Sequence, residues 1–180
     1  MTEELLLGRI ERFQKRLYTR IISDWIPFEA EFLSSKEQIP FAERNKGDYR
    51  QINEGDIWGE AWDSAWFHLT ATAPKEWRGK KIVAHLDFSG EGLVFGTDGS
   101  PIQGITVGSV FAKDFSRDIV RLDATGGDAV ELWIETAGND LFGISQDKDP
   151  ALDDPNRFGR HDCKVRKMRL GVFDENLWHL

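Results

Sequence analysis

Cysteine is almost absent from this chain. Cys163 is the only one among 180 residues, so no disulfide can form within the chain and nothing indicates an oxidising compartment. A chain of this length favours one domain and buries about two thirds of the surface that its unfolded form exposes, so its core needs no disulfide. Basic residues are also few, with 23 Lys and Arg against 31 Asp and Glu and a formal net charge of −8. Because nucleic acids and anionic membranes bind basic surfaces, we expect neither as a partner.

Long apolar runs are missing as well. No run in the sequence is long enough to span a bilayer. The segment MTEELLLGRIERF at the start has an apolar run of only three residues before charge returns, so it does not have the pattern of a signal peptide. Together with the lone cysteine, these absences predict a cytoplasmic protein.

Complete catalytic motifs are a third absence. Residues 90–104 are rich in glycine, but they contain neither a dinucleotide fingerprint that opens a helix nor a phosphate-binding loop. The serines lack the G-x-S-x-G pattern of a nucleophile elbow. His85 and Asp87 form an H-x-D pair on one face of a predicted strand, but no third ligand stands at a suitable spacing. We therefore expect no metal, no cofactor and no catalytic residue in this chain.

Tryptophan, by contrast, is abundant, with seven Trp against two Tyr. Trp58, Trp62 and Trp66 follow one another at four-residue steps in WGEAWDSAWF. Trp66 already belongs to a predicted strand, whereas Trp58 and Trp62 lie in the loop that leads into it. Such side chains either fill the core of a sheet or stack on sugar rings, and both interpretations remain open for these two.

The spacing of apolar residues predicts a helix at the beginning of the chain. Apolar residues recur at steps of three and four up to residue 25, which is typical of one amphipathic helix, and Pro27 ends it. The stripe consists of Leu6, Ile10, Phe13, Leu17, Ile21 and Trp25. Residues 28–57 show no sustained period and contain prolines and glycines, so we expect mostly loop there. This gives a helical arm over residues 1–35 and a β-sandwich domain over residues 36–180.

After Trp58 the apolar residues alternate with polar ones, which predicts antiparallel sheets around a shared core, in a sandwich or a barrel. The inward-facing sets are Ala65, Phe67, Leu69, Ala71 and Ala73, then Ile82, Ala84, Leu86 and Phe88, then Val130, Leu132 and Ile134, and finally Met168, Leu170 and Val172. The segment EGLVF, residues 91–95, is a further strand. Asp98 and Gly99 supply the left-handed residues that a tight hairpin needs after it.

Two further features concern acidic and thiol groups. The segment QDKDPALDDP brings several aspartates together at residues 147–154. Clustered carboxylates can bind Ca²⁺, but the segment lacks the glycine and the terminal Glu of an EF-hand, so a solvated loop is favoured. Cys163 stands at the start of a predicted strand and is expected to be a lone buried thiol.

Five segments carry a resemblance through their order and spacing. They are WGEAWDSAWFHL, APKEWRGKKIVAHLDFSGEGLVF, DGSPIQGI, IETAGNDLFG and RLGVFDENLWHL. In this order they resemble the N-terminal, non-catalytic region of the cytosolic type of class II α-mannosidase, glycoside hydrolase family 38. The resemblance covers nearly the whole chain.

The resemblance implies a mainly β fold, a jelly-roll sandwich of the galactose-binding-like kind after an N-terminal helix. It also implies a large catalytic domain, absent from these residues, whose zinc site opens with H-x-D-x-A-W. His85-Leu86-Asp87 is followed by Phe-Ser-Gly and does not continue that motif. The implied function is an accessory domain of an α-mannosidase with a structural or packing role, which can also help carbohydrate recognition, and the chain alone is then not an enzyme. The alternative is a free-standing carbohydrate-binding module.

The implied partners are the catalytic domain and a mannose-containing oligosaccharide. The candidate carbohydrate-binding residues are Trp58, Trp62, Glu91 and Asn139, because aromatic and amide groups at strand ends can stack on and hydrogen-bond a sugar. The competing hypothesis, that these residues hold loops together or face the catalytic domain, is favoured, so we expect weak sugar affinity or none. The sequence TVGSV at residues 106–110 departs from the family pattern, in which many relatives have Asp and a His-containing stretch. The apolar helix stripe is expected to lie on the sandwich or on a second chain, which would make a homo-oligomer.

Overall fold

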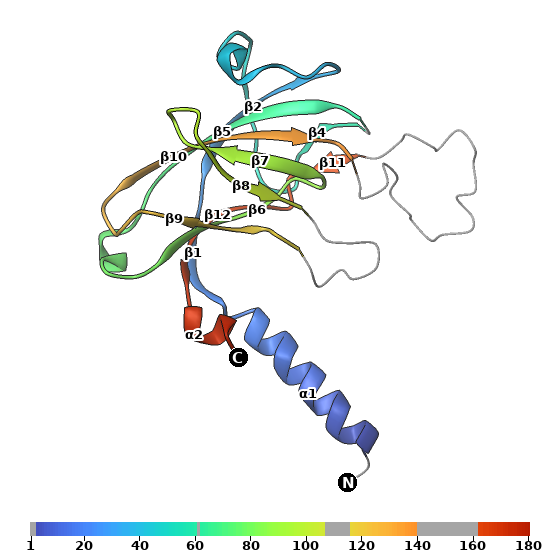
Figure 1. Cartoon of the computed structure of the whole chain (residues 1–180), viewed down its shortest axis with the longest axis vertical. Helices are drawn as coiled ribbons and strands as arrows, with labels where there is room; N and C mark the ends of the chain where they lie inside the picture. The colour runs from blue at the N-terminus through green and yellow to red at the C-terminus, as the bar shows by residue number, and fades with distance from the viewer. Residues whose placement is uncertain (1–2, 61, 107–115, 140–161) are drawn as a thin grey trace, which may run out of the picture.

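Residues 3–60, 62–106, 116–139 and 162–180 are described by the computed structural model, which shows an antiparallel β-sandwich with a helix before it (Figure 1). The helices are α1 (Glu3–Tyr18) and α2 (Glu175–Trp178), and short 3-10 turns occur at Phe41–Glu43 and Lys75–Trp77. The strands are β1 (Ile22–Pro27), β2 (Glu29–Ser35), β3 (Arg50–Gln51), β4 (Ile57–Gly59), β5 (Ser64–Thr72), β6 (Ile82–Asp87), β7 (Glu91–Phe95), β8 (Pro101–Ile105), β9 (Ile119–Leu122), β10 (Ala129–Ala137), β11 (Cys163–Lys164) and β12 (Lys167–Phe173).

The strands form two principal sheets. The smaller has the order β1-β12-β6-β9, and the larger has the order β3-β2-β5-β10-β7-β8, while β11 and β4 pair separately. Among the described residues, every strand pair is antiparallel. The prediction of a mainly β, antiparallel sandwich preceded by an N-terminal helix is confirmed.

The core lies between the two sheets and contains the predicted inward-facing sets. Each of those residues is buried in one apolar cluster, apart from Ala71, which packs against its edge. Phe67 on β5 is fully buried, and its ring centroid lies 4.3 Å from that of Phe88, which follows β6 in the other sheet. Phe32 stacks on Phe67 at 5.7 Å, and Trp58 meets it edge-on at 5.8 Å. Phe67 therefore joins the two layers through aromatic contacts.

The helix is shorter than its apolar stripe predicts. It ends at Tyr18, and residues from Ile22 onward form β1, which pairs with β12. Ile21 is buried against Val83 and Phe173, while Trp25 lies under the guanidinium of Arg169 at 3.9 Å. The prediction of one helix to residue 25 is wrong because pairing with β12 gives the backbone its hydrogen bonds and Ile21 a buried site.

The segment predicted to be mostly loop also contains a long strand. Strand β2 pairs along its whole length with β5 and buries Ala30 and Phe32, which alternate with Glu29 and Glu31. The sandwich therefore begins at Ile22, and the predicted boundary between an arm over residues 1–35 and a sandwich over residues 36–180 is corrected to the end of α1. Apolar and acidic residues alternate here over only four positions. That is too short to predict a strand from sequence in a segment that also contains proline and glycine.

The hairpin between β7 and β8 is present as predicted, but only one of its two turn residues is left-handed. Gly99 has a φ of +84°. Asp98 is not among the residues with positive φ; its carboxylate accepts a hydrogen bond from the Ser100 amide at 2.9 Å. The aspartate contributes by side-chain bonding to the turn rather than by an unusual backbone conformation.

Helix α1 projects away from the sandwich and lies beside α2 (Figure 1). Its stripe residues Leu6, Ile10 and Phe13 are 47%, 45% and 59% exposed. The expectation that the stripe lies on the sandwich is therefore wrong within the described part of the chain. Among the described residues, no helix is both long and apolar enough to cross a membrane.

The aromatic contact between the sheets gives the first prediction. Phe67→Ala should lower the free energy of unfolding by about 3–5 kcal/mol, because it removes a fully buried ring and leaves a cavity. Urea unfolding followed by tryptophan fluorescence measures the change. The matched control is Phe13→Ala on α1, which should change the free energy by less than about 0.5 kcal/mol since its ring is exposed. Equal effects of the two substitutions would contradict the assignment of Phe67 to the centre of the core.

Candidate functional site

Glu91 and Asn139, both predicted from the sequence, contact each other at one end of the larger sheet. Glu91 is the first residue of β7, and Asn139 follows the end of β10. The Glu91 amide donates to Asn139 Oδ1 at 3.0 Å, and Asn139 Nδ2 donates to Glu91 Oε2 at 2.9 Å. The Thr136 hydroxyl donates to the Glu91 carbonyl at 2.8 Å. These reciprocal bonds fix the position of the Glu91 carboxylate.

A recess of about 380 Å³ opens at this place. Its lining residues are Gln38, Ser64, Glu91, Gly92, Leu93, Glu135, Thr136, Ala137 and Asn139. The register pairs Glu135 with Leu93 and Ala137 with Glu91, so these four side chains share one face of the sheet. Gln38, from the segment after β2, donates through Nε2 to Glu135 Oε1 at 2.7 Å.

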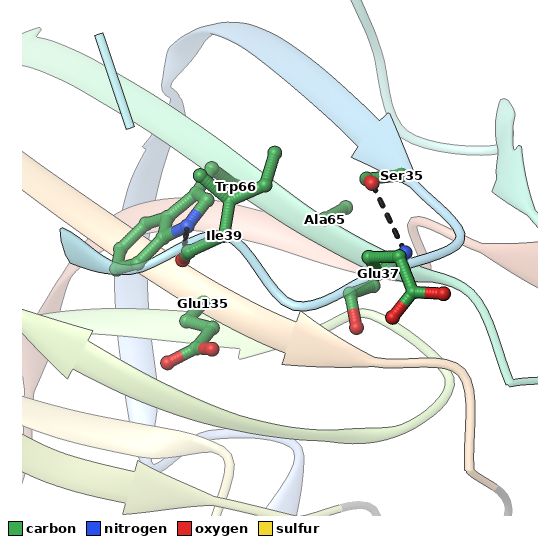
Figure 2. A pocket seen from close by; sticks show the side chains of 7 residues that line it. Ser35, Glu37, Ile39, Ala65, Trp66 and Glu135 are labelled. Carbon is green, nitrogen blue, oxygen red and sulfur yellow. Dashed lines mark hydrogen bonds between the residues drawn. The ribbon is translucent and has the colours of Figure 1, made fainter. Parts of the chain in front are cut away.

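A narrower pocket adjoins the recess and shares Ser64 and Glu135 with it (Figure 2). Trp66 forms part of its wall, and its indole nitrogen donates to the Ile39 carbonyl at 2.7 Å. That bond holds the segment after β2 against the sheet, which places Gln38 opposite Glu135. Trp66 is only 2% exposed, so its indole shapes the wall and offers little open surface.

Trp62 is presented to solvent close to this end of the sheet. Its side chain is 66% exposed and its backbone has a φ of +69°. The Trp62 amide donates to the Gly138 carbonyl at 2.9 Å, which ties it to the residue before Asn139. The Trp62 side chain is not among those that line the recess.

Trp58 is placed differently from the sequence prediction. It lies on β4 rather than in a loop, and it is only 2% exposed. Its indole nitrogen donates to the Phe88 carbonyl at 2.8 Å within the core. Both faces of its ring are enclosed, so the prediction that Trp58 contacts a sugar is corrected here. The structure brings Glu91 and Asn139 together, places Trp62 nearby and assigns Trp58 to the core.

Gln38 and Glu135 complete the recess and were not identified from the sequence. Glu135 alternates outward on β10, so its exposure on that face was predictable, but nothing marked it among 31 acidic residues. Gln38 lies in a segment without a regular period. Its bond to Glu135 joins positions 97 residues apart, a contact that only the folded sheet creates.

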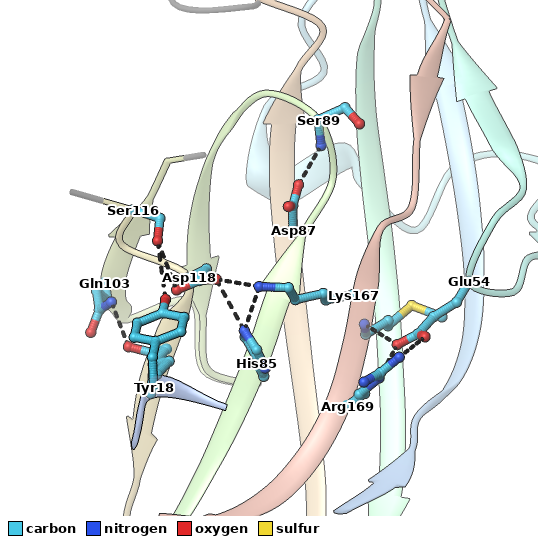
Figure 3. Close-up of polar contacts among 12 residues, drawn as sticks. Tyr18, Glu54, His85, Asp87, Ser89, Gln103, Ser116, Asp118, Lys167 and Arg169 are labelled. Atoms are coloured by element: carbon cyan, nitrogen blue, oxygen red, sulfur yellow. Dashed lines mark hydrogen bonds and ion pairs between the residues drawn. The ribbon is translucent and has the colours of Figure 1, made fainter. Parts of the chain in front are cut away.

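The H-x-D pair is divided between two separate contacts (Figure 3). His85 Nε2 lies 3.0 Å from Asp118 Oδ2, and Lys167 Nζ lies 2.8 Å from that same oxygen. Asp87 instead accepts a hydrogen bond from the Ser89 amide at 3.0 Å. In the part of the chain that the structure describes, no group of three or more His, Cys, Asp or Glu side chains could hold a metal ion.

Asp118 is the electrostatic centre of that cluster. It is 4% exposed, and burial by itself would raise the pKa of its carboxyl group. Hydrogen bonds from His85 and Lys167, with the positive charge of Lys167, outweigh burial and hold the pKa of Asp118 well below its usual range. The cluster joins β6 and β12 to the residue just before β9, on the outer face of the smaller sheet.

Two other sequence predictions concern single segments. Cys163 is fully buried on β11, which confirms the lone buried thiol. The acidic segment 147–154 lies outside the described residues, and so does most of the divergent stretch at residues 106–110.

Acid should destabilise the protein through Asp118. Its folded-state pKa is depressed, so its contribution is fully present above the unfolded pKa of about 3.9 and is lost as the pH falls further. Asp118→Asn should lower the free energy of unfolding near neutral pH by about 1–3 kcal/mol and flatten the pH dependence below about pH 4. Urea unfolding between about pH 3 and pH 7 measures both effects.

The control for this substitution is Asp123→Asn, which removes an exposed carboxylate beyond the end of β9. It should retain the acid dependence of the unsubstituted protein. An Asp118→Asn variant with an unchanged acid slope would show that the cluster does not determine acid stability.

Comparison with known proteins places the chain among α-mannosidase sequences. A family model described as "Alpha-mannosidase, jelly roll domain" matches residues 26–166. Alpha-mannosidase 2C1 of Mus musculus is 25% identical over 96% of this chain, and Alpha-mannosidase G of Dictyostelium discoideum is 26% identical over 86%. The chain spans only 17% and 15% of the length of these two relatives.

Among solved structures, a β-glucuronidase from Ruminococcus gnavus in complex with C6-substituted uronic isofagomine aligns with a TM-score of 0.49 and 13% identity. The alignment covers 84% of this chain and 29% of that one. At that similarity it carries no argument about function. The family model, in contrast, covers most of the sandwich, from the last two residues of β1 to β11, and ends just before β12. The sequence resemblance to class II α-mannosidases is thus confirmed, and the chain belongs to the family of α-mannosidase jelly roll domains.

Proposed function

We propose that this chain is the accessory N-terminal domain of an α-mannosidase and that it acts by packing against the rest of that enzyme. Its small share of the length of both relatives supports this role. In this proposal the catalytic domain, with its zinc site, belongs to a different part of the polypeptide. The proposed compartment is the cytoplasm, as the sequence composition predicts.

The exposed apolar stripe of α1 is the observation that carries the proposal. Leu6, Ile10, Phe13 and Leu17 are spaced four, three and four residues apart, which is the seam of two helical heptads. Leu6, Ile10 and Phe13 are all exposed, and so is Trp178 of α2, the short helix that lies beside α1 (Figure 1). An exposed apolar stripe along one side of a helix is characteristic of a site that another protein surface covers.

The charges beside the seam favour a partner other than a second copy of α1. Arg9 and Arg16 each precede a seam residue and so occupy equivalent flanking positions. Two antiparallel copies would bring these arginines together, and two parallel copies would place Gln14 opposite Arg9 and give neither arginine an acidic partner. An apolar groove with an acidic rim fits the helix better, so we favour docking on the remaining enzyme over a homo-oligomer.

The alternative function is a free-standing carbohydrate-binding module. The contact between Glu91 and Asn139 beside a recess favours it. The two functions differ in a simple observation. A gene that continues beyond Leu180 into H-x-D-x-A-W supports the accessory domain, whereas a gene that ends there supports the module.

Docking through α1 is tested by two neighbouring leucines. Leu6 lies on the seam and Leu5 lies off it, and they are 47% and 59% exposed. With residues 1–180 and the remaining polypeptide produced separately, Leu6→Asp should weaken their association by about tenfold or more, because it places a charge in the apolar contact. The control Leu5→Asp should change the dissociation constant by less than about twofold, a difference that calorimetry resolves. Equal losses for both variants, or a dimer of this chain in sedimentation, would count against the proposed docking.

The chain alone should hydrolyse no α-mannoside. Retaining cleavage needs a nucleophilic carboxylate and an acid about 5 Å apart, and the implied mechanism also needs a complete zinc site. The assay is release of nitrophenol from nitrophenyl α-mannoside, with zinc and cobalt supplied. Turnover above background that disappears in His85→Ala would reveal a catalytic site in this chain and would end the accessory-domain proposal.

A further inference from the structure

We propose that the recess between Glu91 and Glu135 binds a neutral sugar residue through its hydroxyl groups and that Gln38 and Glu135 determine its selectivity. None of the residues that line the recess belongs to α1 or α2. The site is therefore separate from the docking surface, and each can be tested without the other.

The pattern of acceptors in the recess matches hydroxyl groups. Gln38 donates to Oε1 of Glu135, and Asn139 donates to Oε2 of Glu91. Each amide satisfies one oxygen of its carboxylate. Among the described residues, the second oxygen of each carboxylate carries no hydrogen bond, so both remain acceptors for a ligand. Vicinal hydroxyls of a sugar are donors that such paired acceptors can hold.

The charge of the recess excludes anionic sugars. Within the described ranges, neither Glu91 nor Glu135 forms a salt bridge with a basic side chain. A uronate or a sugar phosphate would bring a third negative charge close to two uncompensated carboxylates. A neutral sugar meets no such repulsion, and its hydroxyls form charge-assisted hydrogen bonds with the carboxylates.

The rest of the lining suits the carbon framework of a sugar. Leu93 and Ala137 share the face that carries the two carboxylates and supply apolar surface beside them. The volume of about 380 Å³ lies near the lower limit of small-molecule sites, at about 300–1,000 Å³, which favours a single sugar residue over a long chain.

The recess is preorganised by backbone pairing. Strands β7 and β10 pair from Glu91 to Phe95, and Thr136 and Asn139 both bond to the backbone of Glu91. Gln38 is held in place by the adjacent bond from Trp66 to Ile39. Fixing the acceptors before binding lowers the entropy lost when a ligand orders them. Because the Trp62 ring does not line the recess, stacking adds little, and we expect dissociation constants of about 1–10 mM.

The test is a titration of the 180-residue chain with methyl α-mannoside, followed by amide chemical shifts. Binding in the millimolar range should move the amide signals of Glu91, Glu135 and Asn139. Glu135→Gln keeps the shape of the side chain but removes its charge, and it should weaken binding by about tenfold, as should Asn139→Ala. The anionic glucuronate should bind at least about tenfold more weakly than the neutral sugar.

The matched control is Glu131→Gln. Glu131 lies on the same strand and face, but it bonds to His68 outside the recess. It should change the dissociation constant by less than about twofold. Trp62→Ala should likewise have an effect below about threefold. Thermal unfolding of each variant verifies that the fold is retained.

Several outcomes would overturn the proposal. One is an absence of shifts at the recess at about 50 mM sugar, well above the expected dissociation constant. Equal loss of binding in Glu131→Gln and Glu135→Gln would show a general effect of charge rather than a site. Loss of binding in Trp62→Ala alone would place the sugar on the tryptophan. Competition by Ca²⁺ at similar concentration would identify the recess as a cation site.

Discussion

The contact between Phe67 and Phe88 is the interaction on which the rest of the structure depends. Their ring centroids lie 4.3 Å apart, one from each sheet, and both side chains are almost completely buried. Trp58 packs into the same cluster, and its indole N–H donates to the Phe88 carbonyl. The indole N–H is therefore buried in the core with its hydrogen bond satisfied. With β5 fixed in this way, its other face presents Ser64, which lines the recess, and Trp66, which lines the narrower pocket beside it.

The sheet could be predicted where one face of a strand is buried and the other is not. Strands β5, β6, β10 and β12 alternate for long enough that their period excludes a helix. Strand β1 could not be predicted in this way. Ile21 and Trp25 continue the spacing of the helix stripe, and only pairing with β12 determines that the chain is extended there. Ile22 pairs with Phe173, about 150 residues further along the chain. The local sequence around Ile22 contains no information about so distant a partner strand.

The candidate site was predictable only in part, for the same reason. Glu91 and Asn139 were recognised through their segments and do contact each other. Glu135 became notable only when the register placed it beside Leu93, and Gln38 only when the segment after β2 folded over the sheet. Trp58 and Trp62 belong to one short motif, yet one is 2% and the other 66% exposed. Strand pairing of β4 explains the first, and a left-handed backbone explains the second.

That left-handed backbone at Trp62 has a consequence for how this surface can evolve. Its φ of +69° is a conformation that glycine or asparagine adopts more readily than tryptophan, which has a bulky β-carbon substituent. Its ring is mostly exposed and gains little from the core. Selection for folding alone would exchange tryptophan for glycine at this position within a lineage. A lineage that keeps the tryptophan would therefore record selection for a contact made outside this domain.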